Sequence, residues 1–147
     1  MACPYFVPIA PHPRDLWPRR RNLPLGDGFL GRCAADPAGA CDDEMLRSAC
    51  NLGYANCARL PAERQFDAVR FVVRLESPAV ARMQLCAEHE HRPAYCCELR
   101  YDLSSGKWMH PPELRFKSLA CAAVTAFLDG TGSPFATNGP TDDSNQQ

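Results

Sequence analysis

The sequence predicts an α+β fold, in which an irregular, cysteine-rich N-terminal region with one short helix packs against an antiparallel meander of three or four strands covered by a C-terminal helix. Three observations predict it. Prolines crowd residues 1–40, apolar and polar residues alternate with period two between residues 67 and 103, and apolar residues recur at helical spacing between residues 113 and 128. Turn residues separate these blocks, so each is expected to form its own part of the fold.

The 147 residues suffice for one hydrophobic core. Charged residues make up 22% and hydrophobic residues 46% of the chain, which is typical of a globular protein and not of a wholly disordered or membrane-embedded one. We expect a single domain over residues 1–130, divided into a Cys-ligated loop and helix region (1–60) and a meander with its helix (61–130). Residues 131–147 are almost all small or polar, which predicts a disordered tail.

The first forty residues disfavour long helices and central strands, because proline removes a backbone donor and fixes one dihedral angle. Glycines around residues 26–31 predict turns in which the backbone can approach a bound group closely. An irregular segment of this length cannot bury its own apolar side chains, so it needs a cross-link to hold it. The prolines concerned are Pro4, Pro8, Pro11, Pro13, Pro18, Pro24 and Pro37.

A helix of two to three turns is expected after Asp42. This residue is a good N-cap, acidic residues follow it, and apolar residues recur at helical spacing up to Cys50. Gly53 is expected to end the helix in the left-handed conformation and to turn the chain back, so that Cys57 approaches Cys50.

Three strands are expected, starting at Asp67, over Val80–Glu88 and over Ala94–Leu103, with a short fourth strand at Trp108. Pro111 and Pro112 then open a helix over about residues 113–128, whose apolar side covers one face of the meander. The residues expected on that side are Phe116, Leu119, Ala120, Ala123, Val124, Phe127 and Leu128.

The interpretation of the nine cysteines depends on whether the protein resides in a reducing or an oxidising compartment. Residues 1–10 have no basic segment followed by an apolar one, so we predict a cytoplasmic protein in which clustered thiols are more typical of metal ligands than of disulfides. A net charge of −1 and a pI near 6.4 give no overall positive field, which argues against nucleic acid as a partner. The one basic run, Arg19–Arg21, is interpreted as a solvated turn.

Cys50 and Cys57 are interpreted as half of a metal site, because the bend between them presents both thiols to one side. The chain resembles a family of small uncharacterised bacterial proteins with no assigned activity. The resemblance covers roughly residues 1–128 and is carried by a Cys-Pro-aromatic start at Cys3, an LPLGDG…GxC motif ending at Cys33, and CNLGYAxC from Cys50 to Cys57. It implies one ligand set of Cys3, Cys33, Cys50 and Cys57, with Cys41 outside the pattern as a possible competitor.

Four thiolates suit both zinc and a [4Fe–4S] cluster. Structural zinc usually takes two ligands from one tight turn, whereas these four cysteines are separated by 29, 16 and 6 residues, so the spacing favours the cluster. Glycine amides at Gly26, Gly28, Gly31 and Gly53 are candidate donors to the cluster sulfurs, and Arg19–Arg21 or Arg32 could balance its charge. Zinc, and buried free cysteines without any metal, stay open as alternatives.

A second group of possible ligands or nucleophiles spans Cys86 to His91 and continues at Cys96 and Cys97. Alternation places its members on opposite faces, so we interpret it as a polar hairpin and not as a site. The sequence thus predicts a small iron–sulfur protein that transfers electrons or senses redox state for a protein partner. The alternative is a structural zinc module without redox activity, and a thiol-based or cluster-based enzyme is the third interpretation.

Overall fold

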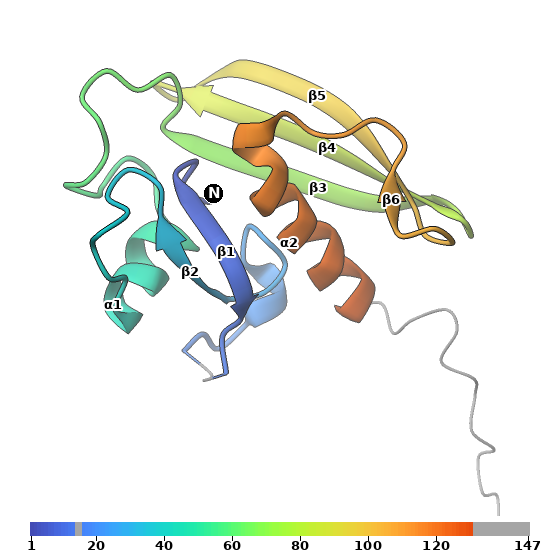
Figure 1. Cartoon of the computed structure of the whole chain (residues 1–147), viewed down its shortest axis with the longest axis horizontal. Coiled ribbons are helices and arrows are strands. Elements are labelled where there is room, and N and C mark those ends of the chain that lie inside the picture. The colour runs from blue at the N-terminus through green and yellow to red at the C-terminus, as the bar shows by residue number, and fades with distance from the viewer. Residues whose placement is uncertain (14–15, 131–147) are drawn as a thin grey trace, which may run out of the picture.

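The computed structural model describes residues 1–13 and 16–130 and confirms the α+β class. A two-stranded sheet and a short helix precede a four-stranded antiparallel meander with strand order β3-β4-β5-β6, and a long helix packs on it (Figure 1). Within the described residues, no helix is long and apolar enough to cross a bilayer. The elements are β1 (Phe6–Pro11), η1 (Arg20–Asn22), β2 (Phe29–Cys33), α1 (Asp43–Met45), η2 (Leu46–Cys50), β3 (Ala68–Ser77), β4 (Val80–His89), β5 (Arg92–Asp102), β6 (Lys107–Trp108) and α2 (Leu114–Gly130).

The N-terminal region is more regular than predicted, because β1 and β2 form an antiparallel ladder in which Phe6 lies opposite Cys33. Proline in β1 was expected to prevent such pairing. It is tolerated because β1 has one neighbouring strand and its register shifts between Pro8 and Ala10, and a missing N–H is least harmful at an edge or a bulge. The predicted disordered tail, residues 131–147, lies outside the described residues.

The chain start is joined to the free edge of the meander. Ala2 and Val69 exchange two backbone hydrogen bonds, each of 2.9 Å, and Ala2 is fully buried. This bridge fixes the backbone immediately before Cys3, although the two residues are far apart in sequence.

The predicted short helix is present. The Asp42 carboxylate accepts a hydrogen bond of 2.8 Å from Met45 N, and the helical turns continue to Cys50, the last five residues as a π-helix. The predicted left-handed conformation of Gly53 is wrong, because positive φ occurs at Ala55 (φ 52°) and not at Gly53. Gly53 is needed for space instead: a Cβ there would lie 2.7 Å from the Ser48 carbonyl oxygen.

The meander and its helix agree closely with the predicted pattern. Met83, Leu85 and Ala87 of β4 and Leu99 of β5 are buried beneath α2, which also contacts β1. One core therefore joins the N-terminal sheet to the meander. The buried side chains of α2 are Phe116, Leu119, Ala120, Ala122, Ala123, Val124 and Ala126.

The β4–β5 hairpin turns through Glu90 (φ 49°) and His91 (φ 63°), both in the left-handed region that a tight two-residue turn requires. The turn is held from outside the hairpin. Glu90 N donates to the Asp67 carboxylate at 2.7 Å, His91 N donates to the Tyr54 hydroxyl at 2.6 Å, and the Tyr54 and His91 rings stack with centroids 4.4 Å apart.

Replacing Glu90 by asparagine is expected to stabilise the fold by about 0.5–1 kcal/mol, because asparagine adopts positive φ at lower cost and keeps the backbone donor to Asp67. Urea unfolding should show a higher midpoint with an unchanged slope. The control is Glu63→Asn at an exposed position without positive φ, where no stabilisation is expected. Equal effects of the two substitutions would contradict the explanation from backbone conformation.

Candidate metal centre

Cys3, Cys33, Cys50 and Cys57, the four predicted ligands, line one small cavity of about 10 Å³, called here the thiol cavity. The rest of its wall is mainly apolar, with Phe6 and Leu60 among the contacts, and it contains no carboxylate or imidazole. A cavity of this volume has room for about one water molecule or a single ion. The structure thus brings together thiols from four separate segments.

Two of the thiols are positioned by strand pairing. Cys33 is the last residue of β2, and Cys3 N donates a hydrogen bond of 3.0 Å to Cys50 O immediately after the bridge from Ala2 to Val69. Phe6 N in turn donates to Cys3 O at 3.2 Å, which starts β1 directly after the site.

The other two thiols flank the bend predicted from the sequence. Cys50 ends the π-helix and is buried, whereas Cys57 is half-buried and begins a turn closed by a 3.2 Å hydrogen bond from Leu60 N to Cys57 O. Gly53 N donates to Met1 O at 3.1 Å, so the middle of the bend is attached to the chain start that carries Cys3.

Asn51 holds the helix end against β2 and was not identified from the sequence. Its side chain is fully buried; Oδ1 accepts from Phe29 N, and Nδ2 donates to the carbonyl oxygens of Phe29 and Leu46, each at 2.9 Å. These bonds connect the segment that ends in Cys33 to the one that ends in Cys50. A buried asparagine directly after a cysteine carries no periodic signal, so only its environment identifies it.

Burial affects the charge state of two of the thiols, Cys3 and Cys50. Burial raises the pKa of Cys3 to about 11, with smaller upward contributions from Cys33 and Cys57. Burial also raises the pKa of Cys50, and Cys41 adds to this shift. The raised pKa values keep both thiols neutral at pH 7, so binding a metal as thiolate must release protons, and metal affinity is expected to rise with pH.

Cys41, the predicted competitor, lies beside the set. Its thiol is hydrogen-bonded to that of Cys50, and it packs against the core, but it does not line the thiol cavity. The structure therefore separates a group of four cavity thiols from a fifth thiol that contacts one of them.

The arrangement is not a ready ligand set for one ion. Within residues 1–13 and 16–130, no group of three or more Cys, His, Asp or Glu side chains is placed to hold a metal ion. The all-sulfur donor chemistry nevertheless fits groups that prefer thiolate, such as zinc or an iron–sulfur cluster.

The charged residue on the cavity wall is Arg59, which the sequence interpretation did not consider. Its Nε lies 3.4 Å from Asp36 Oδ2, and its Nη1 is buried without a hydrogen-bond partner among the described residues. Two of the predicted charge partners, Arg20 and Arg32, lie elsewhere. Arg20 pairs with Asp27, and Arg32 is exposed and lines a different pocket.

The predicted glycine donors are also directed elsewhere. Gly28 N donates to Asp27 Oδ1 at 2.7 Å and Gly53 N donates to Met1 O, and none of the four candidate glycines lines the thiol cavity. The glycines of this region therefore serve chain packing. At Gly28, for example, an added Cβ would lie within 1.9 Å of the Trp17 ring.

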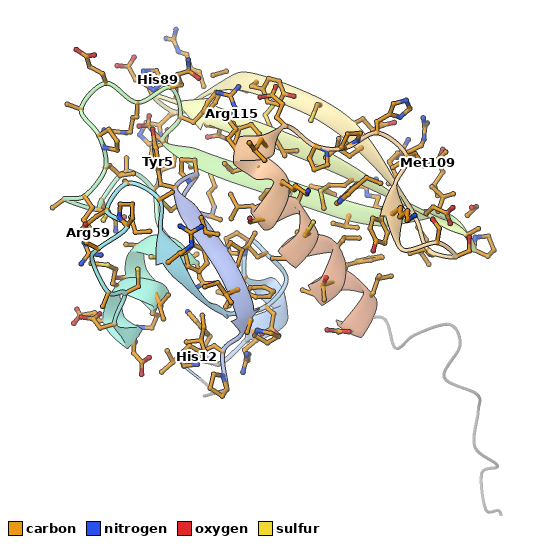
Figure 2. All side chains as sticks on the ribbon, viewed as in Figure 1. Tyr5, His12, Arg59, His89, Met109 and Arg115 are labelled. Carbon is orange, nitrogen blue, oxygen red and sulfur yellow. A yellow bond between two sulfur atoms is a disulfide. The ribbon has the colours of Figure 1, made fainter. Side chains whose placement is uncertain are left out.

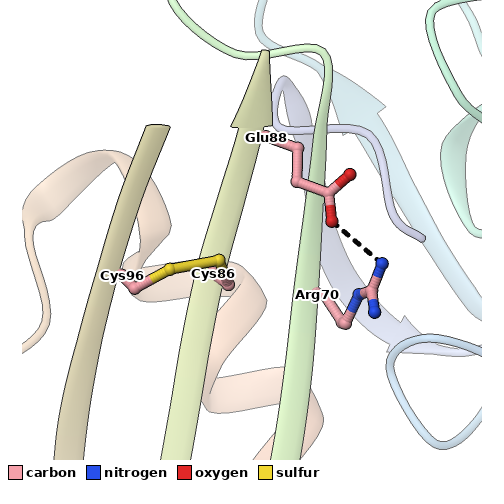
Figure 3. Close-up of a disulfide and its surroundings, with 4 residues drawn as sticks. All are labelled: Arg70, Cys86, Glu88 and Cys96. Carbon is pink, nitrogen blue, oxygen red and sulfur yellow. Dashed lines mark hydrogen bonds and ion pairs between the residues drawn. A yellow bond between two sulfur atoms is a disulfide. The ribbon is translucent and has the colours of Figure 1, made fainter. Parts of the chain in front are cut away.

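Cys86 and Cys96, which we expected not to converge, are joined by a disulfide between β4 and β5 (Figure 3). They are direct partners in the antiparallel register, with Cα atoms 4.2 Å apart, so both side chains leave the sheet on the same face. The sequence argument compared faces along each strand but lacked the register between strands. Cys97 faces the opposite way and packs against the core, as alternation predicts.

No family model, curated protein or solved structure matches the chain in sequence or fold comparison. The fold and the cavity define an α+β protein in which four cysteines line one small cavity.

Proposed function

We propose that this protein binds a [4Fe–4S] cluster through Cys3, Cys33, Cys50 and Cys57 and uses it to transfer electrons or to sense redox state. One observation carries the proposal: four cysteines far apart in sequence line one cavity with no oxygen or nitrogen ligand on its wall. If these cysteines served only as small buried apolar residues, nothing would require four of them to line the same cavity.

One further observation favours a cluster over zinc. The four thiols come from four segments and not from two tight turns. A cluster spreads its ligands over four irons and is wider. The cavity must expand to admit it. The segment that carries Cys57 lies outside helices and strands and can move without breaking a ladder, whereas Cys3 is held by the Ala2–Val69 bridge and by its hydrogen bond to Cys50 O.

The position of the site suits electron exchange with a protein partner. Cys3 and Cys57 are half-buried, so the cavity lies close to the surface while Cys33 and Cys50 anchor it to the core. When bound, the cluster would supply a one-electron couple, and the chain's own residues would bind it, exclude water and shield it. Zinc that joins the same segments without redox chemistry is the alternative function.

The cytoplasmic location is retained as part of this proposal. A reducing compartment keeps the seven free cysteines available as ligands, whereas the Cys86–Cys96 disulfide is typical of an oxidising one. The disulfide lies on the outer face of the meander and is not part of the thiol cavity, so its reduction is expected to leave the site intact.

The proposal is tested by purifying the protein anaerobically, recording its visible spectrum, and measuring iron, acid-labile sulfide and zinc. A brown protein with about four irons and four sulfides per chain is expected. A colourless protein loaded with zinc would establish the alternative. A colourless protein that takes up neither metal after reconstitution would exclude both functions.

A further inference from the structure

The edge of the meander formed by β3 is open beyond its first residues. β3 is the outermost strand of the sheet, and Ala2 pairs with Val69 at its start. Because Val69 directs both its N–H and its C=O to Ala2, alternation along the strand directs the same groups of Phe71 and Val73 to this edge. Among the described residues, no backbone group bonds to Phe71 or Val73 from that edge. An open edge of this kind can pair with a further extended segment.

An apolar groove of about 290 Å³, called here the β3 groove, lies against the open edge. Its walls are Phe71 and Val73 of β3, the loop of residues 23–26, and the C-terminal half of α2, including Phe127. None of the described residues that line it is charged. A cavity of about 150 Å³ can hold one benzene ring, so the β3 groove has room for an aromatic side chain together with part of its backbone.

The β3 groove is separate from the thiol cavity. Among the described residues, none lines both. Figure 2 shows Arg59, which lines the thiol cavity, and the C-terminal end of α2 on opposite sides of β1. An inference about the β3 groove therefore depends neither on bound metal nor on the proposed function.

The chain itself continues from the wall of the β3 groove. Gly130, the last residue of α2, lines the groove, and residues 131–147 follow it. Phe135 carries the one large apolar side chain in this segment. The five residues from Gly130 to Phe135 can span up to about 17 Å, so the ring can reach the groove that begins at Gly130. So short a tether gives an effective concentration on the order of 1 mM, and a weak intrinsic affinity is then sufficient.

We propose that the chain's own C-terminal segment occupies the β3 groove, with the Phe135 ring between β3 and α2 and the backbone around it paired with Phe71 and Val73. Burial of the aromatic ring stabilises this arrangement, and the pairing satisfies the open backbone donors and acceptors of β3. The segment also covers the edge of β3, which keeps the strand from pairing with another chain.

Hydrogen exchange of the full-length chain tests the pairing. We expect the Val73 amide to exchange at least about tenfold more slowly in the wild type than in Phe135→Ser, because loss of the aromatic anchor releases the segment. Ala136→Ser is the matched control and should keep the protection, since successive side chains of an extended segment point to opposite faces. The Leu85 amide, on the interior strand β4, should exchange equally in all three proteins and so reports that the fold is intact.

A second measurement changes the β3 groove and leaves the C-terminal segment unaltered. Chymotrypsin cleaves after large apolar residues such as phenylalanine, so release of residues 136–147 reports how accessible Phe135 is. We expect this release to be about tenfold faster in Val73→Lys, which places a charge in the groove, than in Val72→Lys. Val72 is the matched control, because it is the exposed neighbour on β3 and does not line the groove.

Each outcome decides for or against the proposal. Equal exchange of the Val73 amide in the wild type and in Phe135→Ser, or equal release of residues 136–147 from the two lysine variants, would overturn it. Protection that persists in Phe135→Ser and increases with protein concentration would assign the β3 groove to a second copy of the chain, which also overturns it. Slower exchange in the wild type at every protein concentration, together with faster release from Val73→Lys, supports it.

Discussion

The Cys50→Ser variant is expected to lose its metal almost completely. Its metal affinity should fall by more than the 10- to 100-fold that is typical when a residue hydrogen-bonded to a metal ligand is replaced. Cys50 is the most central of the four thiols: it is buried, its backbone oxygen accepts from Cys3 N, and its thiol interacts with those of Cys3, Cys33 and Cys41. A serine hydroxyl at this position stays protonated at neutral pH and is a poor ligand for iron or zinc.

Metal content per chain, measured after reconstitution and desalting, checks this expectation. Cys41→Ser is the sharpest control, because Cys41 contacts the Cys50 thiol but does not line the cavity, and it is expected to keep the metal. Cys121→Ser, on α2, should also keep it. Loss of metal from Cys41→Ser together with its retention in Cys3→Ser would show that the ligand set is wrong.

The metal-free Cys50→Ser protein should be destabilised by about 1–3 kcal/mol, since it places a hydroxyl in an apolar surrounding. This effect is separate from the loss of metal and is visible in the presence of a chelator. Comparing the two conditions therefore separates ligand loss from a general weakening of the fold.

The Asn51→Ala variant is expected to have the largest effect on stability, about 3–5 kcal/mol. It leaves Phe29 N, Phe29 O and Leu46 O without the side-chain partners they have now, all in a fully buried position. Because Asn51 connects the segments that end in Cys33 and Cys50, metal affinity should fall as well. Asn51→Asp should not restore stability, since a carboxylate offers no donor to the two carbonyl oxygens.

Urea unfolding in the presence of a chelator measures this cost without contribution from bound metal. Asn56→Ala is the matched control from the same bend: Asn56 is exposed, and its Nδ2 donates a 3.1 Å hydrogen bond to Ser48 O. It should cost less than about 1 kcal/mol. A similar cost for both asparagines would mean that Asn51 does not bridge the two segments as described.

The C-terminal half of the fold was predictable because its signals are periodic. Strand alternation from Val69 to Tyr101 and the helical spacing from Phe116 to Val124 reflect one-sided burial, which depends on residues a few positions apart. The helix start at Asp42 was predictable for the same reason, since an N-cap and its hydrogen bond are local.

Of the candidate site, the sequence named only the four cysteines. Cys3, Cys33, Cys50 and Cys57 were grouped by a bend and by a resemblance in motif, and the structure places all four on one cavity. Arg59 and Asn51 were missed, because their importance comes from an unpaired buried donor and from three buried hydrogen bonds. Neither property leaves a pattern in a single sequence.

By itself, the sequence determined the fold class and the short capped helix, since these depend on local spacing and composition. Tertiary structure decided everything that depends on register or on distant pairing. It formed the β1–β2 ladder despite its prolines, attached Ala2 to Val69, and brought Cys86 opposite Cys96. Hydrogen bonding between segments far apart in the chain sets these contacts, and so only the assembled fold shows the cavity that the four thiols line.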